Sequence, residues 1–225
     1  NNYPSYEEKY RNGFLHSRLM NYKQSGFSVD MFVLKSGSQL KFSEYEGIDV
    51  ITGSKKALAT ILQKNNHKKI AVHFLDREMW EPIEANHNNR DILVWVHGSE
   101  IQPWHRRIFN YSTEDELEKA KVTSQDRMNF WRPILSNPHE KLKLIFVSEY
   151  FAQEVMEDYD LTLPKRVYEV IHNPIDTEKF EYLPKPPSQR KKLLSIRPYA
   201  SRKYANDLTV EALLELSKKR FFEDL

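Results

Sequence analysis

The chain has 225 residues, of which 40% are hydrophobic and 29% charged, so it can bury a sizeable core and is not expected to be disordered. Lysine and arginine number 34 against 32 acidic residues, and this near balance argues against a nucleic-acid groove. The chain contains no cysteine, which excludes disulfides, thiolate nucleophiles and zinc sites built on cysteine. No apolar run reaches the length needed to cross a bilayer.

The first ninety residues alternate between helical and strand-like patterns. Apolar side chains recur at helical spacing over residues 11–25, where Gly26 ends the pattern, and a second helix is expected from residues 54 to 63. Short apolar runs predict strands at 29–34, 47–51 and 69–75.

The same alternation continues to residue 171. Strands are expected at 91–96, 142–147 and 167–171, and a helical face begins at Phe151. Residues 113–135 read as a helix with a kink or break at Pro133. Strands that alternate with amphipathic helices predict an α/β fold, with a mostly parallel, Rossmann-like doubly wound sheet between two layers of helices.

The composition changes after residue 173, and this change predicts a domain boundary. Residues 1–173 form the expected first domain, and the proline-rich residues 174–190 an interdomain linker. Residues 191–225 hold a strand at 193–196 and a helical stripe from Ala205 to Leu216, the beginning of a second Rossmann-like domain. One strand and one helix cannot bury a core, and a doubly wound domain normally opens with a strand, whereas only loop-like sequence precedes the first helix here. We therefore expect the parent gene to extend beyond both ends of the chain.

Two cationic side chains follow the last predicted strand. Arg197 lies just past the strand end, and Lys203 lies shortly before the next helix. Ligands of open α/β sheets bind at the carboxyl ends of the strands, and two cations there suit a diphosphate. A solvated basic loop is the alternative for these residues.

The order of several segments resembles the family-4 glycosyltransferases of GT-B fold. Val-Ile-His-Asn-Pro-Ile-Asp at 170–176 is similar to the exit from that family's first domain, and it precedes the strand–Arg197–loop–Lys203–helix unit. In the first domain, Asn12-Gly13-Phe14 is similar to the family's Gly-Gly loop, and His97 follows a central strand as a family histidine does. Val147-Ser148-Glu149 matches a common Val-Ser before a helix.

The resemblance implies a GT-B enzyme that transfers a sugar from a nucleotide diphosphate sugar to a saccharide or lipid-linked acceptor, with retention of configuration. It implies catalytic roles for His97, Arg197 and Lys203, and donor-phosphate contacts for Gly13, Arg197 and Lys203, with no bound metal and no tightly bound cofactor. It also implies polysaccharide or glycoconjugate synthesis in the cytoplasm, with peripheral association with the inner face of the membrane left open.

The sequence departs from the family pattern at three positions. Asn12, Ile196 and Tyr204 stand where glycine is usual in the family. The family's acidic donor-binding motif does not occur in the 225-residue sequence. A non-catalytic Rossmann-like binding domain or an inactive fragment therefore stays open as an alternative. A dehydrogenase is disfavoured because no Gly-x-Gly-x-x-Gly follows a first strand, and no nucleic-acid partner is expected.

Two further groups of polar residues carry simpler expectations. His16 and Arg18 on the first helix are expected to face solvent rather than a ligand. The histidines at 97 and 105 do not have the spacing of a zinc motif, so no metal site is predicted.

Overall fold

A computed structural model describes most of the chain. The described residues are 3–9, 11–87, 89–175, 177, 180–189, 192–194 and 204–222. The chain divides into two compact units, and they are described separately below. The first comprises Asn1–Ile101 and Asn129–Ile171, and the second comprises Gln102–Met128 and His172–Leu225.

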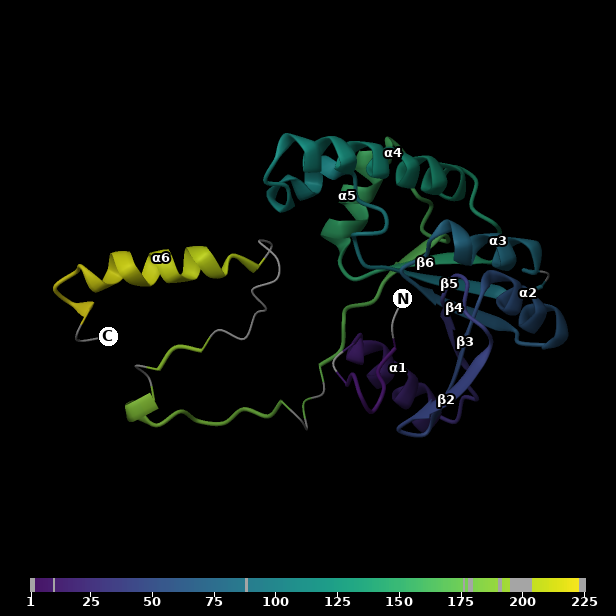
Figure 1. Ribbon diagram of the computed structural model, residues 1–225, viewed down its shortest axis with the longest axis horizontal. Helices are drawn as coiled ribbons and strands as arrows, with labels where there is room; N and C mark the ends of the chain where they lie inside the picture. The colour runs from purple at the N-terminus through teal and green to yellow at the C-terminus, as the bar shows by residue number, and fades with distance from the viewer. Residues whose placement is uncertain are drawn as a thin grey trace. The chain divides into compact units, whose positions relative to one another are not determined.

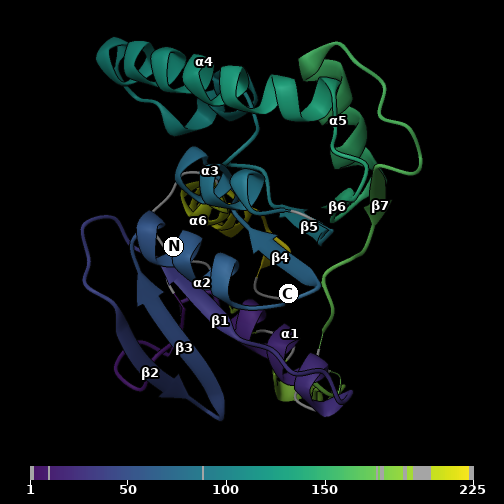
Figure 2. The same ribbon diagram turned by 90° about the vertical axis from the view of Figure 1, so that its right-hand side faces the viewer.

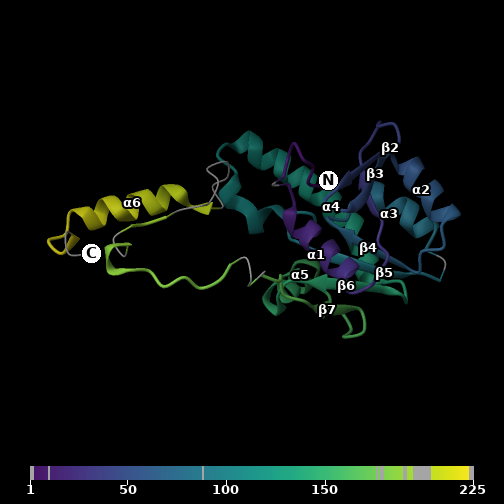
Figure 3. The same ribbon diagram turned by 90° about the horizontal axis from the view of Figure 1, so that it is seen from below.

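The larger sheet of the first unit is parallel throughout. Its strands β4 (Lys69–His73), β5 (Asp91–Val96), β6 (Leu142–Phe146) and β7 (Tyr168–Val170) follow one another in chain order (Figure 3). The two central strands, β5 and β6, bury side chains on both faces, which explains their nearly continuous apolar sequence. This sheet confirms the predicted α/β, Rossmann-like character.

Helices follow the strands of this sheet and begin at polar caps. Asp76 accepts a hydrogen bond from the Met79 N–H at 2.9 Å and begins α3 (Arg77–Ala85). Ser148 accepts one from the Phe151 N–H at 3.1 Å and begins α5 (Glu149–Tyr159), which packs on β6 (Figure 1). The Val-Ser sequence before α5 therefore serves as a strand end and a helix cap.

A second, three-stranded sheet lies in the same unit (Figure 2). Its order is β1 (Met31–Leu34), β3 (Ile48–Gly53) and β2 (Lys41–Tyr45), with β1 parallel and β2 antiparallel to β3. The sequence did not predict β2, because its side chains are mostly exposed and charged or polar. Helix α2 (Lys55–Lys64) follows β3 after the Ser54 cap, as predicted.

Helix α4 (Glu114–Ser136) is longer than its neighbours and continues through Pro133. Of the kink or break predicted at this proline, the break is therefore wrong. The last turns of α4 belong to the first unit and supply much of that unit's core. Trp131 is fully buried, and its indole N–H donates to the Glu100 carbonyl at 2.6 Å.

The described residues of the second unit form helices joined by irregular segments. It holds the 3₁₀ helices η1 (Trp104–Asn110) and η2 (Pro187–Gln189), the beginning of α4, and helix α6 (Asn206–Ser217), which covers the predicted helical stripe. The described residues between 174 and 189 are exposed. Leu193 and Leu194 have no regular secondary structure, and the rest of the strand expected at 193–196 lies outside the described residues. The predicted domain limits stay predictions.

Within the described residues, no helix combines the length and the hydrophobicity that crossing a bilayer requires.

Trp131→Ala should lower the free energy of unfolding by about 3–5 kcal/mol, because it removes a fully buried side chain and its hydrogen bond. Val122→Ala, on the same helix but 65% exposed, should change it by less than about 0.5 kcal/mol. Urea unfolding of both variants measures the difference. Equal effects would show that the end of α4 is not part of the core.

Candidate functional site

Two histidines meet at the carboxyl ends of neighbouring parallel strands. His73 is the last residue of β4, and His97 directly follows β5. The His73 Nδ1 and the His97 Nε2 lie 2.9 Å apart and share one hydrogen bond. Since one proton occupies that bond, a neutral pair presents one further N–H donor and one further lone pair.

Aromatic side chains fix the orientation of this pair. The His73 ring stacks on Trp95 with centroids 4.9 Å apart, and the His97 ring stacks on Phe74 at 4.2 Å. Phe14, in the first turn of helix α1 (Gly13–Gln24), contacts His97 at 5.3 Å between ring centroids. The beginning of α1 therefore lies against the carboxyl edge of β4 and β5.

Both imidazoles are neutral at pH 7. Burial is the main reason that the pKa of His97 falls from 6.5 to about 4, and the Arg18 charge lowers it further. Burial also lowers the pKa of His73 to about 3, with contributions from His97 and Arg18. The pair can therefore donate and accept hydrogen bonds, but it does not supply a cation at neutral pH.

Arg18 is buried against the same cluster, so the expectation that it faces solvent is wrong. Its side chain is only 9% exposed, and its Cζ lies 4.8 Å from the centroid of the Trp95 ring. The cation–π contact offsets part of the desolvation of the guanidinium, by about 2 kcal/mol at a buried site. No acceptor for the buried Nε of Arg18 or Nε1 of Trp95 occurs within the part of the chain that the structure describes.

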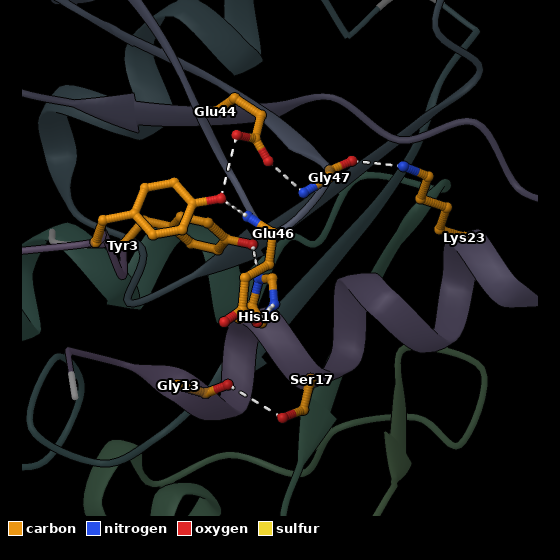
Figure 4. A network of polar contacts seen from close by, with 9 residues as sticks. Tyr3, Gly13, His16, Ser17, Lys23, Glu44, Glu46 and Gly47 are labelled. Carbon is orange, nitrogen blue, oxygen red and sulfur yellow. Dashed lines mark hydrogen bonds and ion pairs between the residues drawn. The ribbon is translucent and has the colours of Figure 1, made fainter. Parts of the chain in front are cut away.

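His16 is also buried, and it too was expected to face solvent. Its Nδ1 lies 2.7 Å from the Tyr3 hydroxyl, and its Nε2 lies 3.1 Å from the Glu46 carboxylate (Figure 4). Burial raises the pKa of Tyr3, so the hydroxyl stays protonated and donates to Nδ1, while Nε2–H donates to Glu46.

The two buried residues fix α1 on two sides. His16 and Arg18 are about 200° apart around the helix, because each residue of an α-helix turns it by about 100°. One side is held by the turn that joins β2 to β3, and the other by Trp95 of β5. This arrangement determines where the first turn of α1 lies.

The turn before α1 takes a left-handed conformation. Asn12 has φ 49° and ψ 39°, in the left-handed region that asparagine tolerates better than most residues. A Cβ added to Gly13 would meet no atom within 4 Å. Fold packing therefore does not require glycine at position 13, and the surface beside it is open.

Glu100 closes the turn after β5. Its carboxylate accepts a hydrogen bond from the His97 N–H at 2.5 Å, and Gly98 takes a φ of 119° that favours glycine. Burial raises the pKa of Glu100, while backbone hydrogen bonds from the turn oppose that rise. The carboxylate thus holds the backbone that carries His97.

The structure brings together two of the four predicted site residues. Gly13 and His97 lie on adjoining segments, linked by the Phe14–His97 contact. Arg197 and Lys203 lie outside the described residues. Across the described ranges, no group of three or more histidine, aspartate or glutamate side chains is placed to hold a metal ion.

Sequence reasoning missed His73, although a signal was present. The apolar run at 69–75 contains His73 near its end, and the run at 91–96 is followed by His97. Neighbouring parallel strands end at the same edge of a sheet, so the two histidines could have been expected together. The burial of Arg18 had no comparable signal, because α1 has only a weak apolar stripe.

Comparison of the chain with protein-family models, with curated proteins and with solved structures finds no match.

The free energy of unfolding should fall as the pH drops from 6.5 to about 4. Both histidines have folded pKa values below 6.5, so the unfolded chain binds protons that the folded chain does not. Each such proton contributes a slope of about 1.4 kcal/mol per pH unit. His73→Phe keeps a ring against Trp95 and should reduce the slope by about one proton.

Urea unfolding at several pH values measures that slope for the parent chain and for His73→Phe. Identical slopes in the two chains would contradict a buried, neutral His73.

Proposed function

We propose that the chain is the acceptor-side part of a retaining, nucleotide-sugar-dependent glycosyltransferase of GT-B fold. One observation carries the proposal: the Gly13 turn and His97, far apart in the sequence, adjoin at the carboxyl edge of a parallel sheet. These are the two first-domain positions that the resemblance assigns to the donor. Ligands of open α/β sheets bind at this edge.

The Gly13 turn suits the approach of a phosphate. Gly13 is the first residue of α1, and the positive end of a helix dipole favours a negative group there. The space that a Cβ would occupy is empty, so a phosphate oxygen can come close to the backbone. This supports a role for Gly13 at the donor diphosphate.

His97 suits contact with a sugar hydroxyl. The Nε2 of His97 shares a hydrogen bond with His73, so Nδ1 is the ring nitrogen that can pair with a hydroxyl, as donor or acceptor according to the tautomer. The His97 ring is held by Phe74 on one side and by the bond to His73, so a sugar would meet a fixed group. At neutral pH it acts by positioning rather than as a general acid.

Arg197 and Lys203 complete the proposal from the second domain. As the diphosphate departs, negative charge develops on its oxygens, and fixed cations stabilise that charge. Arginine presents two parallel N–H donors to phosphate, and lysine a mobile point charge.

Arg197→Ala and Lys203→Ala should each lower kcat of the parent enzyme by about a hundredfold or more, the scale seen when one charge-stabilising group is removed. Steady-state kinetics with a nucleotide sugar measures the effect. Near-parental turnover in both folded variants would refute the phosphate role and favour a non-catalytic domain.

Gly13→Ala should strongly weaken the affinity for the donor nucleotide, because the new methyl group occupies the space that the phosphate needs. It should leave the free energy of unfolding within about 1 kcal/mol of the parent, because the methyl group meets no protein atom. Gly53→Ala is the structural control. Its Cβ would lie 2.9 Å from the Ala57 Cβ, so it should destabilise the chain by about 1–3 kcal/mol.

Calorimetric titration with a nucleotide diphosphate and thermal unfolding measure the two effects separately. Unchanged nucleotide affinity in Gly13→Ala would place the donor elsewhere.

A further inference from the structure

We propose that Arg18, together with the His73–His97 pair, binds an anionic group, a carboxylate or a phosphate, of the ligand taken up at this edge of the sheet. The identity of that ligand as a sugar substrate rests on the proposed function, which would make that substrate an acidic one. The anion site itself rests only on the side chains described above.

Among the described residues, the charge of Arg18 has no counterion. More than nine-tenths of the side chain is buried, yet no carboxylate among the described residues pairs with it. The acid on the other side of α1, Glu46, pairs with His16. The neighbouring imidazoles are neutral, and the electrons of the Trp95 ring compensate only part of a full charge.

An unpaired buried cation is rare in proteins without a ligand. Buried charges are paired or bind an ion, because removing a charge from water is strongly unfavourable. If position 18 served only for packing, an apolar side chain of the same length would fill it without the free-energy penalty of burying a charge. The burial of Arg18 therefore points to a partner that arrives from solution.

Neighbouring groups can supply further hydrogen bonds to an anion. The Trp95 indole N–H is buried without an acceptor, and the histidine pair offers one N–H whichever ring holds the shared proton. The guanidinium adds a planar fork that matches two oxygens of a carboxylate or a phosphate. No other charged side chain contacts this cluster through a described ion pair.

Thermal unfolding of the 225-residue chain tests the proposal with inorganic phosphate, glucuronate and neutral glucose, at constant ionic strength. At about 100 times Kd, the bound anion should raise Tm by roughly 5–10 °C, whereas glucose should not. A larger rise with glucuronate assigns a carboxylate, and a larger rise with phosphate assigns a phosphate.

Arg18→Met keeps an apolar chain against Trp95 and removes the charge. It should lose the anion-dependent rise in Tm, and without anion its Tm should equal or exceed that of the parent. Arg11→Gln is the matched control, since it removes an exposed arginine that pairs with Glu8, and it should keep the rise.

Three results would overturn the proposal: no anion-dependent rise in the parent, a rise that persists in Arg18→Met, or a lower Tm of Arg18→Met without anion. If Arg18→Met does not fold, Arg18→Lys is the variant to test, because lysine keeps the positive charge but lacks the paired N–H donors of the guanidinium. An apparent Kd at least threefold weaker supports the site, and an unchanged Kd refutes it. The thermal test does not depend on nucleotide-sugar turnover, so its failure is distinct from failure of the proposed function.

Discussion

The burial of two polar side chains on opposite sides of α1 determines the geometry of the whole edge. His16 is held between the Tyr3 hydroxyl and the Glu46 carboxylate, and Arg18 lies over the Trp95 ring. These contacts hold α1 from both sides, so the helix has one well-defined position. That position brings the Gly13 turn and Phe14 against His97.

The two sides of α1 differ in how fully their polar groups are satisfied. On the His16 side, Tyr3 donates to Nδ1 and Nε2–H donates to the carboxylate, so each group has a partner. On the Arg18 side, the guanidinium Nε and the indole N–H of Trp95 have none among the described residues. A satisfied network stabilises, and an unsatisfied one beside an open edge indicates a place for a ligand.

The sequence predicted the parallel sheet because short apolar runs, among them β5 and β6, alternate with amphipathic helices. The family resemblance implied a role for His97 from its place after β5, and that role stays a prediction. The sequence did not predict β2, whose exposed residues carry no alternation, or α3, whose cap at Asp76 was overlooked. The sequence could not predict contacts between segments far apart in the chain, such as the burial of Arg18 against Trp95 of β5. Propensity and periodicity report local structure, not long-range partners.

The central claim is that the carboxyl edge of β4 and β5 beside α1 binds an anionic ligand. The most direct test follows the indole N–H signals of the four tryptophans by NMR during titration with phosphate and with glucuronate. The Trp95 signal, assigned with Trp95→Phe, should shift and saturate. The Trp131 signal should not move, because its N–H already donates to the Glu100 carbonyl. A stationary Trp95 signal in the folded chain, or equal shifts of all four, would contradict the claim.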